Sequence, residues 1–137
     1  PLLWGIHTGT AMTELLLDAH ADPNSRDSGK PLWWEAFEGS YSEDNFRTLK
    51  LLLDRGADVN LRYGENGPVG WAANRKNWQS VMLMIERGAA WKDERAFGTP
   101  IPHELAYDLQ ARKGSGEKIP DELPKLIEMY ENLQQPQ

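Results

Sequence analysis

Two short segments of this chain recur in the same order, and this repetition constrains the fold more than any other feature of the sequence. The segment LLLDAHADPN ends at Asn24 and returns as LLLDRGADVN, which ends at Asn60. A weaker copy, LMIERGAAWK, ends at Lys92, so the copies are 36 and 32 residues apart. A period of this length is typical of solenoids, in which each repeat is one supersecondary unit that buries its apolar face against its neighbours.

A second element precedes each leucine-rich segment. It reads PLLWGI at residues 1–6, PLWWEA at residues 31–36 and PVGWAA at residues 68–73. Pro31 and Pro68 fit the first turn of a helix, where the missing backbone N–H costs nothing. Each repeat is therefore expected to be a pair of helices, with the leucine-rich segment as the second helix.

The residue that follows each leucine-rich helix predicts how that helix ends. Gly56 and Gly88 stand where a left-handed C-terminal cap needs a residue tolerant of positive φ. His20 occupies the same position in the first copy. Because a side chain is unfavourable in this conformation, we expect the first unit to be slightly strained or differently capped.

The second element resembles the Thr-Pro-Leu-His-x-Ala signature of ankyrin repeats, with Trp replacing an aliphatic residue at the same position each time. The resemblance covers about residues 1–112. It implies an all-α ankyrin-repeat solenoid of about four helix-turn-helix units with β-turn loops, in a single domain over residues 1–137. The units are expected at about residues 1–27, 28–60, 61–93 and 94–137, the last being a degenerate C-terminal cap.

Two regions depart from a regular repeat. The second unit carries about five extra residues around 40–45, between its two helices. Glu43 and Asp44 there favour the start of the second helix through its dipole. In the last unit, residues 102–107 are expected to form the first helix and residues 111–118 a flexible connection. Its second helix should present one apolar face, formed by Leu123, Leu126, Ile127, Tyr130 and Leu133.

The repeated tryptophans are interpreted as core residues. Trp4, Trp34 and Trp71 occupy equivalent positions on the first helices. Such positions normally face the neighbouring repeat, where a large aromatic area stabilises stacking. A ladder for stacking a ligand is the less favoured alternative.

Neighbouring aromatic residues are candidates for partner binding. Trp33 stands one place before a buried position, so at least one of the two adjacent tryptophans should reach the surface. Phe37 and Glu38 follow at the end of that helix, on the face that ankyrin proteins commonly use for binding, and Tyr41 lies in the insertion. Exposed aromatic side chains are favoured anchors of protein interfaces.

The resemblance also implies a groove whose fingertips are the β-turn loops and whose floor is formed by the first helices. The partner-binding residues that it implies are Tyr63, Glu65, Asn66, Arg95 and Phe97 on the loops, with Asn74 and Arg75 on the floor.

No residue pattern indicates catalysis, a metal or a cofactor. The chain has no Cys, and its three His residues share no metal-ligand spacing. It has neither a Gly-rich phosphate loop before a helix nor a Gly-x-Ser-x-Gly elbow. We therefore expect a protein without catalytic residues, metal or cofactor.

The charge balance limits the classes of partner. A net charge of −6 without clustered Lys and Arg argues against binding to nucleic acid or an anionic membrane. An acidic surface fits a basic or mixed protein partner better. No stretch approaches the roughly 18 apolar residues needed to span a bilayer, so we expect no membrane insertion.

A finer resemblance points to a specific function. Trp-rich first helices, the RGAD turn at residues 55–58 and a degenerate last unit with a Leu-Ile-Glu helix are similar to those of some type VI secretion immunity proteins. Those proteins are encoded beside lipase effectors, and the resemblance implies a periplasmic inhibitor that binds its toxin. Because the chain opens in apolar sequence without an initiating Met, we expect that a leader or the front of the first repeat has been removed. The alternative is a cytoplasmic scaffold or regulator that binds another protein without inhibiting it.

Overall fold

The computed structural model of the 137-residue chain describes residues 10–27, 30–31 and 43–133. This part of the chain is mostly helical, as predicted, with two short β-hairpins added. The helices are α2 (Thr10–Asp18), α3 (Glu43–Asp54), α4 (Pro68–Asn74), α5 (Trp78–Glu86), α6 (Ile101–Ser115) and α7 (Glu122–Leu133). The strands are β1 (Arg26–Asp27), β2 (Lys30–Pro31), β3 (Arg95–Ala96) and β4 (Thr99–Pro100).

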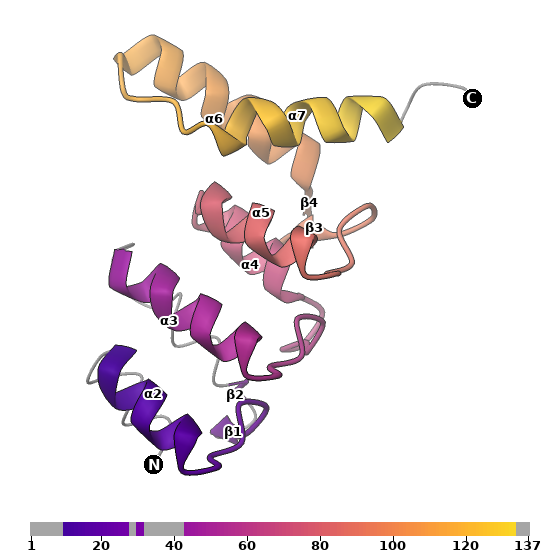
Figure 1. Ribbon diagram of the computed structural model, residues 1–137. Helices are drawn as coiled ribbons and strands as arrows, with labels where there is room; N and C mark the ends of the chain where they lie inside the picture. The colour runs from indigo at the N-terminus through magenta and orange to yellow at the C-terminus, as the bar shows by residue number, and fades with distance from the viewer. Residues whose placement is uncertain (1–9, 28–29, 32–42, 134–137) are drawn as a thin grey trace.

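The helices are layered in chain order, from α2 at the bottom of Figure 1 to α6 and α7 at the top. Helix α2 packs against α3, α3 against α5 and α5 against α7, while α4 packs against both α5 and α6. The hairpins and the turn before α4 lie along one side of these layers. The apolar residues buried between the layers form one core, in which the largest fully buried side chains include Leu49, Leu52, Trp78, Val81, Met84, Ile101, Leu105, Leu123 and Leu126.

The predicted left-handed caps are present at all three positions. His20, Gly56 and Gly88 have φ angles of 70°, 95° and 92°. After each of them, the next backbone N–H reaches back into the last helical turn, as from Ala57 to the Leu52 carbonyl at 2.9 Å. Of the two alternatives expected at His20, the structure has the strained one, with a side chain in the left-handed region.

The turns after α2 and α3 are joined by an asparagine side chain. The Asn24 amide donates to the Gly56 carbonyl at 3.0 Å and accepts from the Asp58 backbone N–H at 2.5 Å. One repeat later, the Asn60 side chain accepts from the Ala90 N–H at 2.8 Å. The recurring asparagine in the sequence thus connects each turn to the next one.

The outer helices are also linked by repeated ion pairs. Arg55 pairs with Asp18 at 2.5 Å, and Arg87 pairs with Asp54 at 2.5 Å. All four side chains are partly exposed, so each pair is expected to contribute only about 0–1 kcal/mol.

The last unit differs from its prediction. Residues 111–118 were expected to be a flexible connection, but α6 continues through Ser115. It ends at Gly116, whose φ is 77° and whose N–H donates to the Arg112 carbonyl at 2.9 Å. The Gly-Ser-Gly run at this point is therefore a helix end with a left-handed cap and not a linker. Of the predicted apolar face of α7, Leu123, Leu126 and Tyr130 are buried, whereas Leu133 is 43% exposed.

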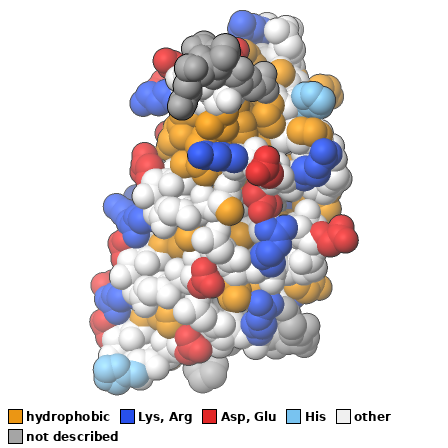
Figure 2. Space-filling view, turned by 90° about the vertical axis from the view of Figure 1, so that its right-hand side faces the viewer, with side chains coloured by type: hydrophobic (Ala, Val, Ile, Leu, Met, Phe, Trp, Pro, Cys, Tyr) orange, Lys and Arg blue, Asp and Glu red, His pale blue; other side chains and the backbone are white. Residues whose placement is uncertain are grey.

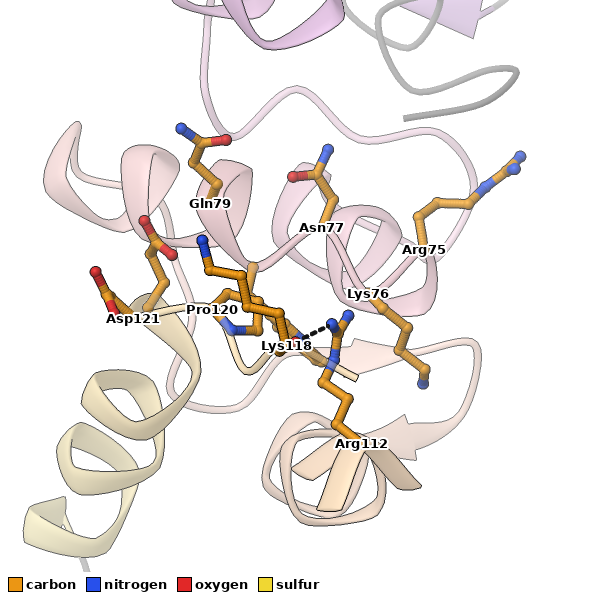
Figure 3. Close-up of a pocket in the computed structure, with 10 residues that line it drawn as sticks. Arg75, Lys76, Asn77, Gln79, Arg112, Lys118, Pro120 and Asp121 are labelled. Atoms are coloured by element: carbon orange, nitrogen blue, oxygen red, sulfur yellow. Dashed lines mark hydrogen bonds between the residues drawn. The ribbon is translucent and has the colours of Figure 1, made fainter. Parts of the chain in front are cut away.

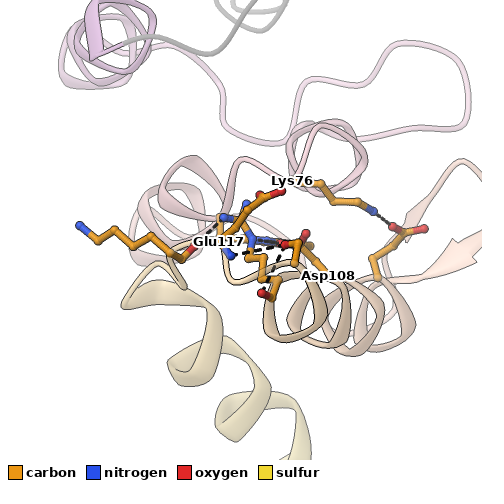
Figure 4. Close-up of polar contacts among 8 residues, drawn as sticks. Lys76, Asp108 and Glu117 are labelled. Carbon is orange, nitrogen blue, oxygen red and sulfur yellow. Dashed lines mark hydrogen bonds and ion pairs between the residues drawn. The ribbon is translucent and has the colours of Figure 1, made fainter.

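The extra length of α6 allows a buried polar contact that the sequence did not predict. The Trp78 indole N–H donates to the Asp108 carboxylate at 2.6 Å, and the Arg112 Nε donates to the same carboxylate at 2.8 Å (Figure 4). Trp78 and Asp108 are both buried. A buried carboxylate needs such partners, because an unpaired one is strongly disfavoured.

The tryptophans predicted to be core are only partly accounted for. Trp4 and Trp34 lie outside the described residues. Trp71 is half-buried and packs against the core. The insertion is described only from residue 43, where α3 begins as the acidic pair predicts. None of the described helices is both long enough and apolar enough to span a membrane.

Candidate functional site

Two β-hairpins and one isolated β-bridge lie on the same side of the described layers. Strands β1 and β2 pair with Arg26 opposite Pro31, and β3 and β4 pair with Arg95 opposite Pro100. Between these hairpins, Tyr63 and Asn66 form an isolated antiparallel bridge. The loops expected to act as fingertips are therefore tight β-turns at the predicted residues. Figure 2 views this side and shows Lys and Arg side chains recurring from bottom to top, with acidic and hydrophobic side chains between them.

The middle turn is fixed largely by its own contacts. Arg62 pairs with Glu94 at 2.5 Å and also donates to the backbone carbonyl of Glu65. Tyr63 is half-buried and packs against the core, so only part of its ring is available to a partner. Glu65, at the tip, is exposed, and Asn66 is half-buried.

The turn between β3 and β4 carries an aromatic residue in an unfavourable backbone conformation. Phe97 and Gly98 form its two-residue loop, with φ angles of 50° and 88°. Tight hairpin loops of this kind favour Asn or Gly at the first position, because a bulky side chain clashes with its own backbone there. Phe97 is nevertheless 46% exposed. Strain combined with exposure is more typical of binding residues than of residues selected for stability.

Phe97 rests on helix α4. Its ring meets the Trp71 ring edge-on, with centroids 4.3 Å apart. The hairpin can approach this closely because α4 has Gly70 at the contact, where a Cβ would collide with the backbone carbonyl of Arg95. A glycine that the packing requires thus places the aromatic pair.

The rest of the surface comes from α4 and from α6 beside it. Arg75 lies four residues after Trp71, and Tyr107 lies four residues after His103, so each pair shares a helix face. Arg75 and His103 are exposed, and Tyr107 is 70% exposed. Asn74, also predicted as a groove residue, is exposed at the end of α4.

Lys76 connects the two helices. It has a φ of 58°, pairs with Glu104, and places its ammonium 5.7 Å from the centroid of the Tyr107 ring. An ammonium over an aromatic face is attracted to it, which fixes the orientation of the ring. Neither Lys76 nor Tyr107 was among the predicted site residues. Helical spacing from His103 could have placed Tyr107 on the surface, but the Lys76 contact depends on how α4 and α6 pack.

We call the surface formed by the tip of the β3–β4 hairpin and the adjoining turn of α4 the aromatic–basic face. It consists of Trp71, Arg95 and Phe97. The predicted Arg95 and Phe97 thus lie on one hairpin, whereas Arg75 and the Lys76–Tyr107 pair lie at the end of α4 and on α6. The structure does not describe Trp33, Phe37, Glu38 or Tyr41, which lie outside the described residues.

A pocket of about 510 Å³ lies at the far end of α4. It lies between the α4–α5 turn and the connection from α6 to α7, with Arg75 extending from its rim (Figure 3). Arg112 donates to the Lys118 carbonyl at 2.8 Å across its wall. Basic side chains outnumber acidic ones in the lining, with Arg75, Lys76, Arg112 and Lys118 against Asp121 and Glu122. Two of these cations are already paired, Lys76 with Glu104 and Arg112 with Asp108.

The titratable side chains of the described residues were compared with the requirements of a metal site. Within the described ranges, no three His, Asp or Glu side chains are grouped closely enough to hold a metal ion. Burial, followed by the nearby charge of Glu94, raises the pKa of Tyr130 well above its usual range, but its hydroxyl donates to the Trp91 carbonyl at 2.8 Å, a structural contact.

Compared with models of protein families and with curated proteins, the chain matches none of them. The functional assignment therefore depends on the residues and geometry described above.

Proposed function

We propose that the chain is an ankyrin-repeat module that binds another protein, and that this partner is a secreted bacterial toxin which the module inhibits. The observation that carries the binding proposal is the exposed Phe97 ring, placed on Trp71 by a strained two-residue turn. The contact with Trp71 does not by itself explain why so much of the Phe97 ring is exposed to solvent. Binding to a partner would explain why the strain is retained.

Three repeated features support the ankyrin class. The left-handed caps recur at equivalent positions, the turns are joined by Asn24 and Asn60, and a β-turn precedes α4 and another precedes α6. Together with the two recurring sequence elements, these contacts favour stacked helix–turn–helix units of one kind. The long α6 and the α7 face suit a terminal cap.

The geometry of the face favours binding over catalysis. It is an open surface formed by a fingertip and helix α4, and Trp and Arg are among the residue types enriched at interface hot spots. An inhibitor needs tight binding, which a few central anchors of this kind can supply. We assign the partner as a type VI lipase effector, which the module would bind in the periplasm. This assignment follows from the resemblance of the sequence to immunity proteins.

The proposal is tested by coexpressing the toxin encoded by the neighbouring gene with this protein and measuring both cell survival and the affinity of the purified pair. The decisive variant is Phe97→Asn. Asparagine tolerates the left-handed conformation, so the fold should be as stable as before or more so, while affinity should fall by at least about 2 kcal/mol, roughly thirtyfold.

Leu15→Ala is the matched control, because Leu15 is 61% exposed on α2, away from the face. It should leave affinity unchanged. If cells die equally with and without the protein, or the purified pair forms no complex, the inhibitor proposal is wrong and a scaffold for another protein becomes the better account.

A further inference from the structure

We infer that Phe97 is a projecting anchor that enters an apolar hollow on the partner, and that Gly70 is the residue that positions this ring for the contact. The inference rests on the proposal that the chain binds a protein. It adds that the partner supplies the concave side of the contact and that this chain supplies the convex side.

The first argument is a comparison of the two hairpins. They pair in the same register, so Ser28-Gly29 in the sequence of the first is equivalent to Phe97-Gly98 in the second. A loop of this length therefore does not require an aromatic residue. Phe97, with a φ of 50°, also stands where bulky side chains are disfavoured. A strained residue that the turn does not need calls for another role, which we assign to its exposed ring.

The second argument is the shape of the tip. A two-residue loop is the shortest connection between antiparallel strands, so a side chain at its first position projects beyond them. One side of the Phe97 ring rests on Trp71, with the ring centroids 4.3 Å apart, and 46% of the residue is exposed. A projecting ring is fully desolvated only when the partner surrounds it, and the strongest interface anchors lie in such well-packed pockets. The surface that fits this tip is therefore an apolar hollow.

The third argument is that the ring is positioned by the packing of the hairpin on α4. A Cβ on Gly70 would collide with the backbone carbonyl oxygen of Arg95, two residues before Phe97. The equivalent residues in the other two copies of this sequence element are the larger Leu3 and Trp33. The small residue thus occurs in the unit that supports the aromatic tip. An anchor that is held in place before the partner arrives loses less entropy on binding.

Charge does not select the partner at this tip. Arg62 and Arg95 are accompanied on the same turns by Glu65, Asp93 and Glu94, and Arg62 is paired with Glu94. With both signs present, the turns attract neither an acidic nor a basic partner strongly. The exposed ring is therefore the feature that a partner would recognise.

An exposed aromatic side chain could also enter the interface of a lipid bilayer. A single ring attaches a protein to a membrane only weakly, and the anions on the adjoining turns are repelled by a negatively charged lipid surface. A hollow on a protein is therefore the favoured site.

The first test is a series of substitutions at position 97, measured as the affinity of the purified protein for the toxin encoded by the neighbouring gene. Phe97→Ser, which copies the loop of the first hairpin, should weaken binding roughly thirtyfold or more. Phe97→Trp should also weaken it, by about tenfold or more, because a hollow that fits a phenyl ring is overfilled by an indole. A flat surface would accept the indole, so wild-type affinity of Phe97→Trp would overturn the inference.

The role of Gly70 is tested by a double-mutant cycle. Gly70→Ala should weaken toxin binding about fivefold or more in the wild-type background and much less in the Phe97→Ser background, because it acts by displacing the ring. Thermal unfolding of each variant shows whether it is folded. Gly114→Ala is the matched control, since a Cβ there meets no neighbouring atom. Equal losses in the two backgrounds would mean that Gly70 supports the fold and does not position the ring.

Exposure alone is controlled by Tyr107→Ala. Tyr107 is the more exposed ring, at 70%, but it lies along helix α6 and not at a hairpin tip. We expect this substitution to change toxin affinity much less than Phe97→Ser. A larger effect of Tyr107→Ala would place the main contact on α6 and contradict the inference.

A measurement without the toxin uses β-cyclodextrin, a small molecule whose apolar hollow accepts a phenyl ring. Its addition should shift the nuclear magnetic resonance signals of the Phe97 ring, and Gly70→Ala should reduce the response. Vesicles of phosphatidylethanolamine and phosphatidylglycerol should not bind the protein. An unresponsive Phe97 ring, or vesicle binding that Phe97→Ser abolishes, would overturn the inference.

These measurements separate the inference from the proposed function. If the toxin complex forms and tolerates Phe97→Trp, the inhibitor proposal stands and the hollow is wrong. If no toxin complex forms but β-cyclodextrin takes up the Phe97 ring, the inhibitor proposal fails and the anchor inference stands.

Discussion

The turn that ends the α3 repeat and the turn that ends the α5 repeat have related sequences but join their neighbours in different ways. At the first turn, the Asn60 side chain accepts a hydrogen bond from the Ala90 N–H of the following turn. At the second turn, Lys92 stands where the asparagine would be, and the connection is made by the Tyr130 hydroxyl, which donates to the Trp91 carbonyl at 2.8 Å. The Trp91 and Tyr130 rings also meet edge-on, 4.8 Å apart.

This difference follows from the element that packs against each turn in the next unit. An asparagine can make this hydrogen bond where the next unit has a copy of the same turn, because the backbone N–H of that turn then lies at an equivalent position. The last unit presents α7 and no such turn, so a long side chain from that helix makes the contact instead. The earlier units are joined by hydrogen bonds that recur from turn to turn. At the final junction, between the turn after α5 and helix α7, the contact is made by the side chains of Trp91 and Tyr130.

The largest effect is expected from breaking the final junction at Trp78. Trp78→Ala should lower the free energy of unfolding by about 3–5 kcal/mol, because it empties a fully buried site and leaves the Asp108 carboxylate without one of its donors. Urea denaturation followed by circular dichroism measures the change. Trp78→Phe should cost less, since it keeps most of the ring and removes only the indole N–H. If Trp78→Ala costs less than about 1 kcal/mol, the buried contact does not hold the last unit in place.

The next effect is expected at a junction between repeats. Asn24→Ala removes two hydrogen bonds to the following turn and should cost about 1–2 kcal/mol, reduced somewhat by the exposure of the site. Lys92→Ala is the matched control at the equivalent position of the last turn, where we expect a change within about 0.5 kcal/mol. Equal effects of the two substitutions would contradict the proposed difference between the junctions.

The features that recur in every repeat could be predicted from the sequence, whereas the features found in a single unit could not. The caps at His20, Gly56 and Gly88, the fingertip turns and the mostly helical content were all predictable, because each depends on residues near one another in the chain. The extension of α6 was not, because its Gly-Ser-Gly end has the composition of a linker. In the structure the extension is joined to the rest of the helix by Arg112, whose Nε donates to the buried Asp108 carboxylate one turn earlier.

The candidate site divides in the same way. Arg75, Arg95 and Phe97 were predicted from their positions in the repeat, and the structure places Arg95 and Phe97 on the β3–β4 hairpin and Arg75 at the end of α4. Lys76 and Tyr107 were not predicted, because their contact joins residues from two units and depends on how α4 lies beside α6.

A smaller effect, dependent on pH, is expected at Tyr130. Burial and the charge of Glu94 raise the pKa of this phenol, whereas in the unfolded chain it ionises near pH of about 10. The unfolded state therefore releases its proton first, and the contribution of Tyr130 to stability, complete below that pH, is lost as the pH rises above it. Tyr130→Phe should cost about 1 kcal/mol at neutral pH through the lost hydrogen bond, and should make the alkaline loss of stability shallower. Ultraviolet titration of the folded protein should show a phenol, absent from the Tyr130→Phe variant, that ionises only above the range of an unfolded tyrosine; ionisation of Tyr130 within that range would mean that the final junction is open.

The smallest effect is expected at the cap of the first described helix, where a substitution should stabilise the protein. His20 has a φ of 70°, at a position where the equivalent residues Gly56 and Gly88 have no side chain. The left-handed conformation costs an ordinary residue roughly 1–2 kcal/mol, and glycine loses part of that advantage to its greater freedom in the unfolded chain. His20→Gly should therefore raise the free energy of unfolding by about 0.5–1 kcal/mol. Gly56→Ala, the reverse change one repeat later, should lower it by a similar amount, since a Cβ there meets no neighbouring atom and only the backbone conformation opposes it. If His20→Gly lowers stability instead, the imidazole makes a contact that outweighs the strain, and the three caps are equivalent in geometry but not in energy.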